Sequence, residues 1–203
     1  MSERFKNMVK VPNEPAAKLL SLTNTRLKTP ITAPVAALPE EVLTELDGKG
    51  AMLDVLRLMS IVLPARERVW WACLAARDYL EKIASDPPKS LTTSEEWVFK
   101  PTEENRERAR VSMDDAYMDD ETVNCALSVL YSDGTLGPAD LAQYPAPAGA
   151  AETSAFIMNI VALDKNSDRF EEYGQILIDR AVNIARGGNG RLESNKPMEE
   201  ATQ

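Results

Sequence analysis

The sequence predicts an all-α fold, an irregular antiparallel helical bundle of about seven to nine helices. Apolar residues recur at three- and four-residue spacing through most of the chain, and no strand-like alternation runs beyond four residues. Several of these segments begin with residues that favour a helix start, as at Pro39, which two glutamates follow. The connections between segments are mostly short, and short connections favour antiparallel neighbours.

Four helices are expected in the first half of the chain. A short one covers 14–23, within a basic arm at 1–38, and a second begins at Pro39 and reaches about 46. The segment 52–63 is apolar nearly all round, which is typical of a central buried helix. The helix at 64–83 organises the core, and the inner face expected for it comprises Val69, Ala72, Cys73, Ala76, Leu80 and Ile83.

Three further helices precede a connection rich in Gly and Pro at 132–151. A capping box at 92–95 opens a short helix through Trp97. Thr102, which two glutamates follow, opens a charged helix to about 115, and a third helix begins at Asp120 or Thr122 and ends near 130.

The last two helices, at 152–163 and 168–186, are expected to form a hairpin, with Asp168 as the N-cap of the second. Their expected inner faces comprise Phe156, Ile157, Ile160 and Val161, followed by Phe170, Tyr173, Leu177, Ala181 and Ile184. Together the helices form a single domain at 39–187, and the polar segment 188–203 is predicted to be a disordered tail.

The net charge of −9 is distributed unevenly over the 203 residues. Residues 1–30 contain six lysines and arginines against two glutamates, so the rest of the chain is strongly acidic, which argues against a nucleic-acid surface. Two interpretations of the basic arm are open, since it either meets an acidic partner or folds back onto its own acidic body. No apolar run approaches the ~20 residues that span a bilayer, and the N-terminus does not resemble a secretory signal. We therefore expect a cytoplasmic protein with no membrane partner.

The chain contains no histidine, which removes Ser–His–Asp catalysis, Cys–His catalysis and imidazole metal sites in one step. Catalysis would then have to rest on carboxylates, lysine, tyrosine or a borrowed cofactor, and we expect no catalytic site and no cofactor. One enzymatic alternative is a carboxylate-based glycan hydrolase of the all-helical type, with Glu95 and Glu96 beside Trp97 as its candidate acids. Whether the acidic cluster at 114–121 binds a cation stays open. The two cysteines, Cys73 and Cys125, lie in apolar helical patterns and are expected to be buried free thiols.

Trp70 and Trp71 are adjacent on one helix, so their side chains point ~100° apart and cannot share one seam. One is expected in the core. The other is either exposed, as in a binding hot spot, or covered by the N-terminal arm or the Gly/Pro connection. We predict a non-catalytic module that binds another protein, as an adaptor or cargo chaperone, and a homodimer is left open. The residues predicted to bind are Trp70, Trp71, Arg77, Trp97, Leu136, Pro138, Tyr144 and Pro145.

Several motifs together resemble a family of uncharacterised bacterial helical proteins, a domain of unknown function. They are Leu63-Pro-x-Arg66-x-x-Val-Trp-Trp-Ala-Cys73-x-x-Ala-Arg77, Trp97-x-x-x-Pro101-Thr-Glu-Glu-Asn105-Arg, Ser132-x-Gly134-x-Leu-x-Pro138, and a final helix ending Ile184-Ala-Arg-Gly187. The resemblance covers roughly residues 15–187. It implies an association with gene clusters of contractile type VI secretion systems, and it assigns no functional residue.

Overall fold

The computed structural model describes residues 3–192 and confirms an all-α fold for them. Nine α-helices and two short 3₁₀ helices make up the regular structure of this range, in which Thr135 and Pro145 form an isolated β-bridge. The α-helices are α1 (Ala16–Leu22), α2 (Pro39–Gly48), α3 (Met52–Val62), α4 (Ala65–Ile83), α5 (Lys89–Phe99), α6 (Glu103–Asp114), α7 (Val123–Leu130), α8 (Ala150–Lys165) and α9 (Phe170–Ala185).

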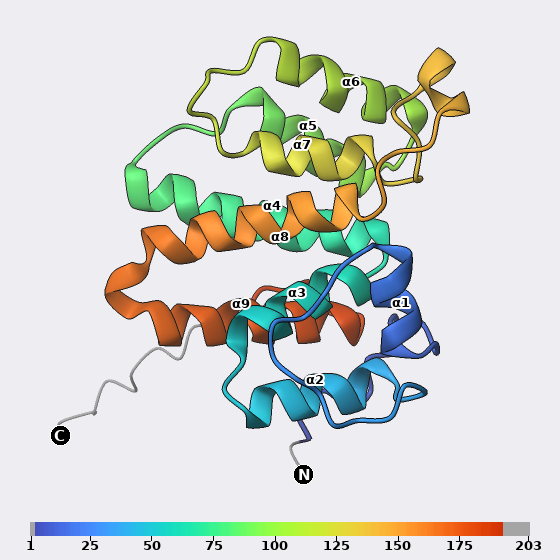
Figure 1. Cartoon of the computed structure of the whole chain (residues 1–203). Coiled ribbons are helices and arrows are strands. Elements are labelled where there is room, and N and C mark those ends of the chain that lie inside the picture. Colours follow the sequence, from blue (N-terminus) through green and yellow to red (C-terminus); the bar gives the residue numbers. More distant parts are fainter. Residues whose placement is uncertain (1–2, 193–203) are drawn as a thin grey trace, which may run out of the picture.

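The centre of the molecule is formed by α4 and α8, which run side by side in the same direction (Figure 1). Arg68 near the start of α4 pairs with Glu152 near the start of α8 at 2.8 Å, in keeping with this parallel alignment. On one side the pair is covered by α5, α6 and α7, and on the other lie α1, α2, α3 and α9 (Figure 1). Consecutive helices from α4 to α9 alternate in direction, so the bundle is antiparallel in sequence order and irregular at its centre.

Alanines are prominent among the residues that the two central helices bury. The buried alanines are Ala72, Ala75 and Ala76 of α4, and Ala151, Ala155 and Ala162 of α8. Because the distance between helix axes depends on the side chains at the contact, alanines on both helices allow a close approach. Five of the six residues expected on the inner face of α4 are buried there, and the sixth, Ile83, is not.

Two predicted helix starts differ from the structure. The capping box at 92–95 is wrong, because α5 already begins at Lys89 and the hydroxyls of Thr93 and Ser94 donate to carbonyl oxygens one turn earlier. Asp168 is not the N-cap of α9, since it lies in a 3₁₀ turn and pairs with Lys82 at 3.1 Å. Thr102 does cap α6, where its side chain accepts the N–H of Asn105 at 3.3 Å.

The prediction for the inner face of α8 is wrong. Ile157 is 40% exposed, and Phe156, Ile160 and Val161 are only partly buried. The residues that α8 buries are instead Ala151, Ser154, Ala155, Met158, Asn159, Ala162 and Leu163. Among the residues predicted inward elsewhere, Ile83 at the end of α4 is 41% exposed and Phe170 at the start of α9 is 37% exposed.

The segment before α2 lies against the body of the protein. Phe5 and Met8 are buried in the common core. Arg4 pairs with Asp47 of α2 at 3.0 Å and with Asp179 of α9 at 2.6 Å. Lys10 pairs with Glu67 of α4 at 2.7 Å, so cations of the arm meet acids of the body. No helix among residues 3–192 has the length and apolar content needed to cross a bilayer.

Candidate functional site

A groove with a volume of about 980 Å³ opens at the end of the bundle where α4 and α8 both terminate. The last turns of α4 and the second half of α8 line it, together with the α4–α5 connection and the α6–α7 connection. In Figure 1 these four segments gather on the left of the view. The groove therefore takes residues from parts of the chain that are nearly 90 positions apart, between Tyr79 and Lys165.

The floor of the groove is apolar. Its side chains come from two helices and one connection, and they are Tyr79, Leu80 and Ile83 of α4, Phe156, Ile157, Ile160 and Val161 of α8, and Tyr117 of the α6–α7 connection. Tyr117 is 83% exposed, so it stands at the edge of the groove. Six of the residues expected in the core lie here, and all of them except Leu80 keep part of their apolar surface open to solvent.

The rim of the groove is acidic. Five carboxylates line it, Asp86, Asp119, Asp120, Glu121 and Asp164, against one ammonium group, Lys165. None of the five forms an ion pair with a lysine or arginine among residues 3–192, whereas carboxylates elsewhere in that range often do. Asp120 instead accepts hydrogen bonds from Ser90 and Thr122. Burial, and then the negative charges of Glu121, Asp119 and Asp120, raise the pKa of the Tyr79 hydroxyl on the groove floor.

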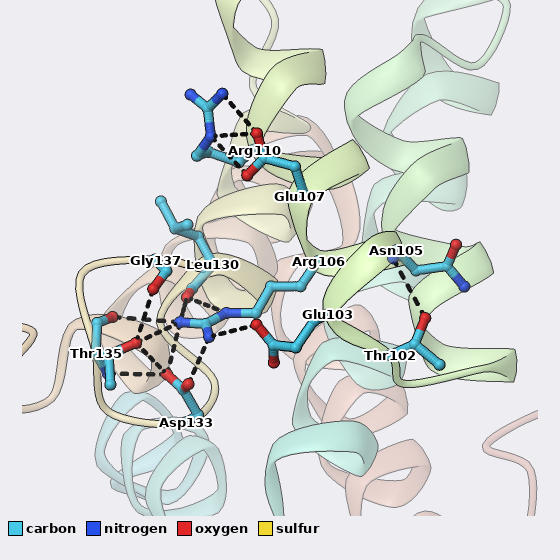
Figure 2. A network of polar contacts seen from close by, with 10 residues as sticks. All are labelled: Thr102, Glu103, Asn105, Arg106, Glu107, Arg110, Leu130, Asp133, Thr135 and Gly137. Atoms are coloured by element: carbon cyan, nitrogen blue, oxygen red, sulfur yellow. Dashed lines mark hydrogen bonds and ion pairs between the residues drawn. The ribbon is translucent and has the colours of Figure 1, made fainter. Parts of the chain in front are cut away.

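A second polar feature ties α6 to the connection after α7. Figure 2 shows the side chain of Arg106, which is only 2% exposed, reaching from α6 into the loop that follows α7. Its Nε and Nη2 donate to the carbonyl oxygen of Leu130 at 2.8 and 2.5 Å. Its Nη1 and Nη2 donate to the two carboxylate oxygens of Asp133 at 2.5 and 2.6 Å, and Nη2 also reaches Thr135 Oγ1 at 2.8 Å. The guanidinium thus fixes the start of the Gly/Pro connection.

Comparison with known proteins gives one family assignment. A family model described as a family of unknown function, DUF6931, matches residues 42–185, which is most of the chain. The chain belongs to this family. Neither the search of curated proteins nor the search of solved structures gave a match. The DUF6931 region runs from within α2 to the end of α9, so it contains every residue of the groove and the whole Arg106 network.

Within the DUF6931 region, the side chains of the two adjacent tryptophans point in different directions, as helix geometry requires. Trp71 is fully buried, and its indole N–H donates to the carbonyl oxygen of Leu177 at 3.0 Å. Trp70 is half-buried, and its indole N–H donates to the carbonyl of Asn189 at 2.7 Å. Its ring centroid lies 6.1 Å from that of Phe99, which is largely exposed. The segment just after α9 therefore covers part of Trp70. This segment belongs to the predicted tail at 188–203, of which residues 193–203 lie outside the described residues.

Trp70 lines a second, smaller hollow of about 240 Å³ with Arg66, Phe99 and Lys10. Of the other residues predicted to bind, Trp97 and Pro138 are buried and Leu136 is half-buried. Tyr144 and Pro145 are exposed on the Gly/Pro connection. None of these residues lines the acidic groove, so the structure does not bring the predicted binding residues together there.

The carboxylates proposed for glycan hydrolysis are both engaged by arginines. Glu95 accepts two hydrogen bonds from Arg77 of α4, at 2.8 and 2.5 Å. Glu96 pairs with Arg108 of α6 at 2.6 Å. The two acids therefore link α5 to two different helices, and Arg77, predicted to bind a partner, is one of the links.

The acidic cluster at 114–121 does not converge on one point. Asp114 pairs with Arg110 at 3.5 Å and Asp115 with Lys89 at 3.7 Å, while Asp119, Asp120 and Glu121 line the groove. Within residues 3–192 no group of acids and cysteines has the arrangement of a metal site. The sequence does not reveal the groove, because the residues of its floor have the helical spacing expected of a core. One feature of the sequence could have indicated the groove: α8 contains more large apolar residues than one buried helix face can hold.

Proposed function

We propose that this protein is a non-catalytic protein-binding module, an adaptor or cargo chaperone of the cytoplasm, and that its partner docks in the acidic groove. The observation that carries the proposal is the outward apolar face of α8. Ile157 and its neighbours give the groove a floor that remains partly open to solvent. Contiguous apolar surface of this kind, rimmed by polar groups, is typical of a protein interaction site.

We also propose a cellular setting in which the module works. The motifs around Trp70, Arg106 and Gly134 resemble a bacterial family associated with contractile type VI secretion systems. We propose on that resemblance that the protein is an accessory to such a system. A soluble adaptor suits this role because its net negative charge of −9 limits self-association while one apolar surface engages the partner.

Site-specific photo-crosslinking tests the proposal. A photoreactive phenylalanine replaces Ile157 in the groove or, as a matched control, Val111, which is 44% exposed on α6 and outside the groove. Both full-length variants are expressed in the native host and irradiated. We expect a discrete crosslinked protein from position 157 that is absent from position 111. Identical crosslinking patterns from the two positions would contradict docking in the groove.

A further inference from the structure

We infer that the occupant of the groove is a basic amphipathic helix, with one apolar face and flanks rich in lysine or arginine. The inference rests on the proposed function and specifies the chemistry of its partner. Three observations carry it: the acidic rim of the groove, the composition of its floor, and the poor fit of the other available occupants.

The rim selects for positive charge. Asp86, Asp119, Glu121 and Asp164 have no described lysine or arginine as an ion-pair partner, although the same chain pairs many of its other carboxylates. Electrostatic complementarity fixes partner choice and accelerates encounter. A segment with cations on both flanks of its apolar face would supply the charges that the rim lacks.

The floor suits a helix better than a strand. It is made mainly by side chains of α4 and α8, two helices that run in the same direction, and no described residue of the groove belongs to a strand. A strand-like ligand gains its affinity from backbone pairing with an exposed sheet edge, which the groove does not offer. A helix instead places residues at i, i+3, i+4 and i+7 into an apolar groove.

Two other occupants fit poorly. In an isologous dimer the same patch meets itself, so a second copy docked on this groove would bring two acidic rims together. The first part of the chain's own basic arm is engaged elsewhere, since Arg4 binds Asp47 and Asp179, and Lys10 binds Glu67. Neither of these arm residues lines the groove.

Selection from a randomised library tests the inference without presupposing a sequence. A display library of 16-residue peptides is selected on the full-length protein and counter-selected on Ile157→Glu, which places a charge on the groove floor. We expect the enriched peptides to carry apolar residues at helical spacing and a clear excess of Lys and Arg. The inference is overturned if no peptide separates wild type from Ile157→Glu, or if those that do show no excess of basic residues.

Charge reversal at the rim then measures the electrostatic contribution to peptide binding. The best selected peptide is titrated by fluorescence anisotropy against the double variant Asp119→Lys/Glu121→Lys and against a control, Glu41→Lys/Glu104→Lys, which makes the same charge change at exposed positions in the first turns of α2 and α6. We expect the double variant to weaken binding at least about tenfold at low salt, and less at high salt, because exposed charges are screened. Equal effects of the double variant and the control would overturn the role of the rim.

The two proposals fail differently. If position 157 crosslinks a native partner but the selected peptides lack basic residues, the groove binds a protein and the inferred chemistry is wrong. If neither crosslinking nor selection distinguishes the groove from the control surface, the proposed function fails as well.

Discussion

Replacing Arg106 with methionine should destabilise the protein far more than the same change one turn later at Arg110. Both arginines lie on α6 and both form ion pairs, as Figure 2 shows. The side chain of Arg106 is 2% exposed, whereas that of Arg110 is 31% exposed and pairs with Glu107 and Asp114 at the surface. Methionine keeps an apolar stem of similar length at both positions, so the comparison isolates the guanidinium.

The magnitude follows from the partners that Arg106 leaves behind. The carbonyl of buried Leu130 loses both donors, and an unsatisfied buried acceptor costs ~1–3 kcal/mol. Asp133 is 42% exposed and can be rehydrated, so its share is limited to ~1 kcal/mol, as for a surface ion pair. The free energy of unfolding should therefore fall by about 2–4 kcal/mol, or about 4–16 °C in Tm for a chain of this size. Arg110→Met should cost less than ~1 kcal/mol.

Urea unfolding followed by circular dichroism, with thermal melts alongside, measures both variants. We expect the midpoint for Arg106→Met to move while the m-value stays constant, which identifies a change in stability rather than in the unfolded state. A loss for Arg106→Met no larger than that for Arg110→Met would refute the reasoning, because it would mean that Leu130 and Asp133 find other partners.

The same network predicts a pH dependence. Burial acts to raise the pKa of Asp133, but the hydrogen bonds from Thr135 and the charge of Arg106 outweigh it and lower the pKa. A lowered folded-state pKa contributes stability above the usual aspartate pKa of ~3.9, and that stability is lost as pH falls through the folded value. The difference between wild type and Arg106→Met should therefore shrink below about pH 4. A difference that stays constant from neutral to acidic pH would contradict this assignment.

Three further predictions rest on single sites. The hydrogen bonds from Lys49 and Thr32 lower the pKa of Glu45 from 4.5 to about 2. The wild type therefore has a stabilising contribution above pH 4.5 that it loses toward pH 2, and Glu45→Gln should lack this contribution, as measured by acid titration of the folded fraction. Trp71→Ala should lower the free energy of unfolding by ~3–5 kcal/mol, as measured by urea unfolding, because the Trp71 indole is fully buried. Trp70→Ala should lower it by clearly less, because the Trp70 indole is only half-buried. Burial raises the pKa of the Cys73 thiol, so both free cysteines should resist Ellman's reagent at pH 8 in the native protein and react once it is unfolded in urea.

The sequence was sufficient to predict the fold class and part of the core. Helical periodicity identified Val69, Ala72, Ala76 and Leu80 on α4 because polar residues interrupt that helix on its outer side. The cap at Thr102 was also predictable, since capping depends on a side chain and a backbone N–H three residues away. Such features are local, and local features can be read from one chain.

The role of Arg106 could not be predicted in this way. Its partners lie 24 to 29 positions further along the chain, in a connection whose path depends on how α6 and α7 pack. The sequence offered a weaker signal, an Asn-Arg pair after a helix start and an Asp-Gly-Thr turn after a later helix. Neither motif indicates that the other is its neighbour, because their contact is tertiary.

The failure at α8 has a different cause, and it locates the candidate site. A helix that is apolar nearly all round gives periodicity no basis for choosing which face is buried, so the choice falls to packing. The close approach of α4 and α8 favours alanine on the inner face, and Ala151, Ala155 and Ala162 occupy it. The large residues Phe156 and Ile157 are then directed outward, beside Ile83. If this face were ordinary solvent-exposed surface, polar residues could occupy it with little loss of stability. An apolar outer face, bordered by carboxylates that no described lysine or arginine pairs with, is instead what we expect of a site that exchanges water for a basic partner.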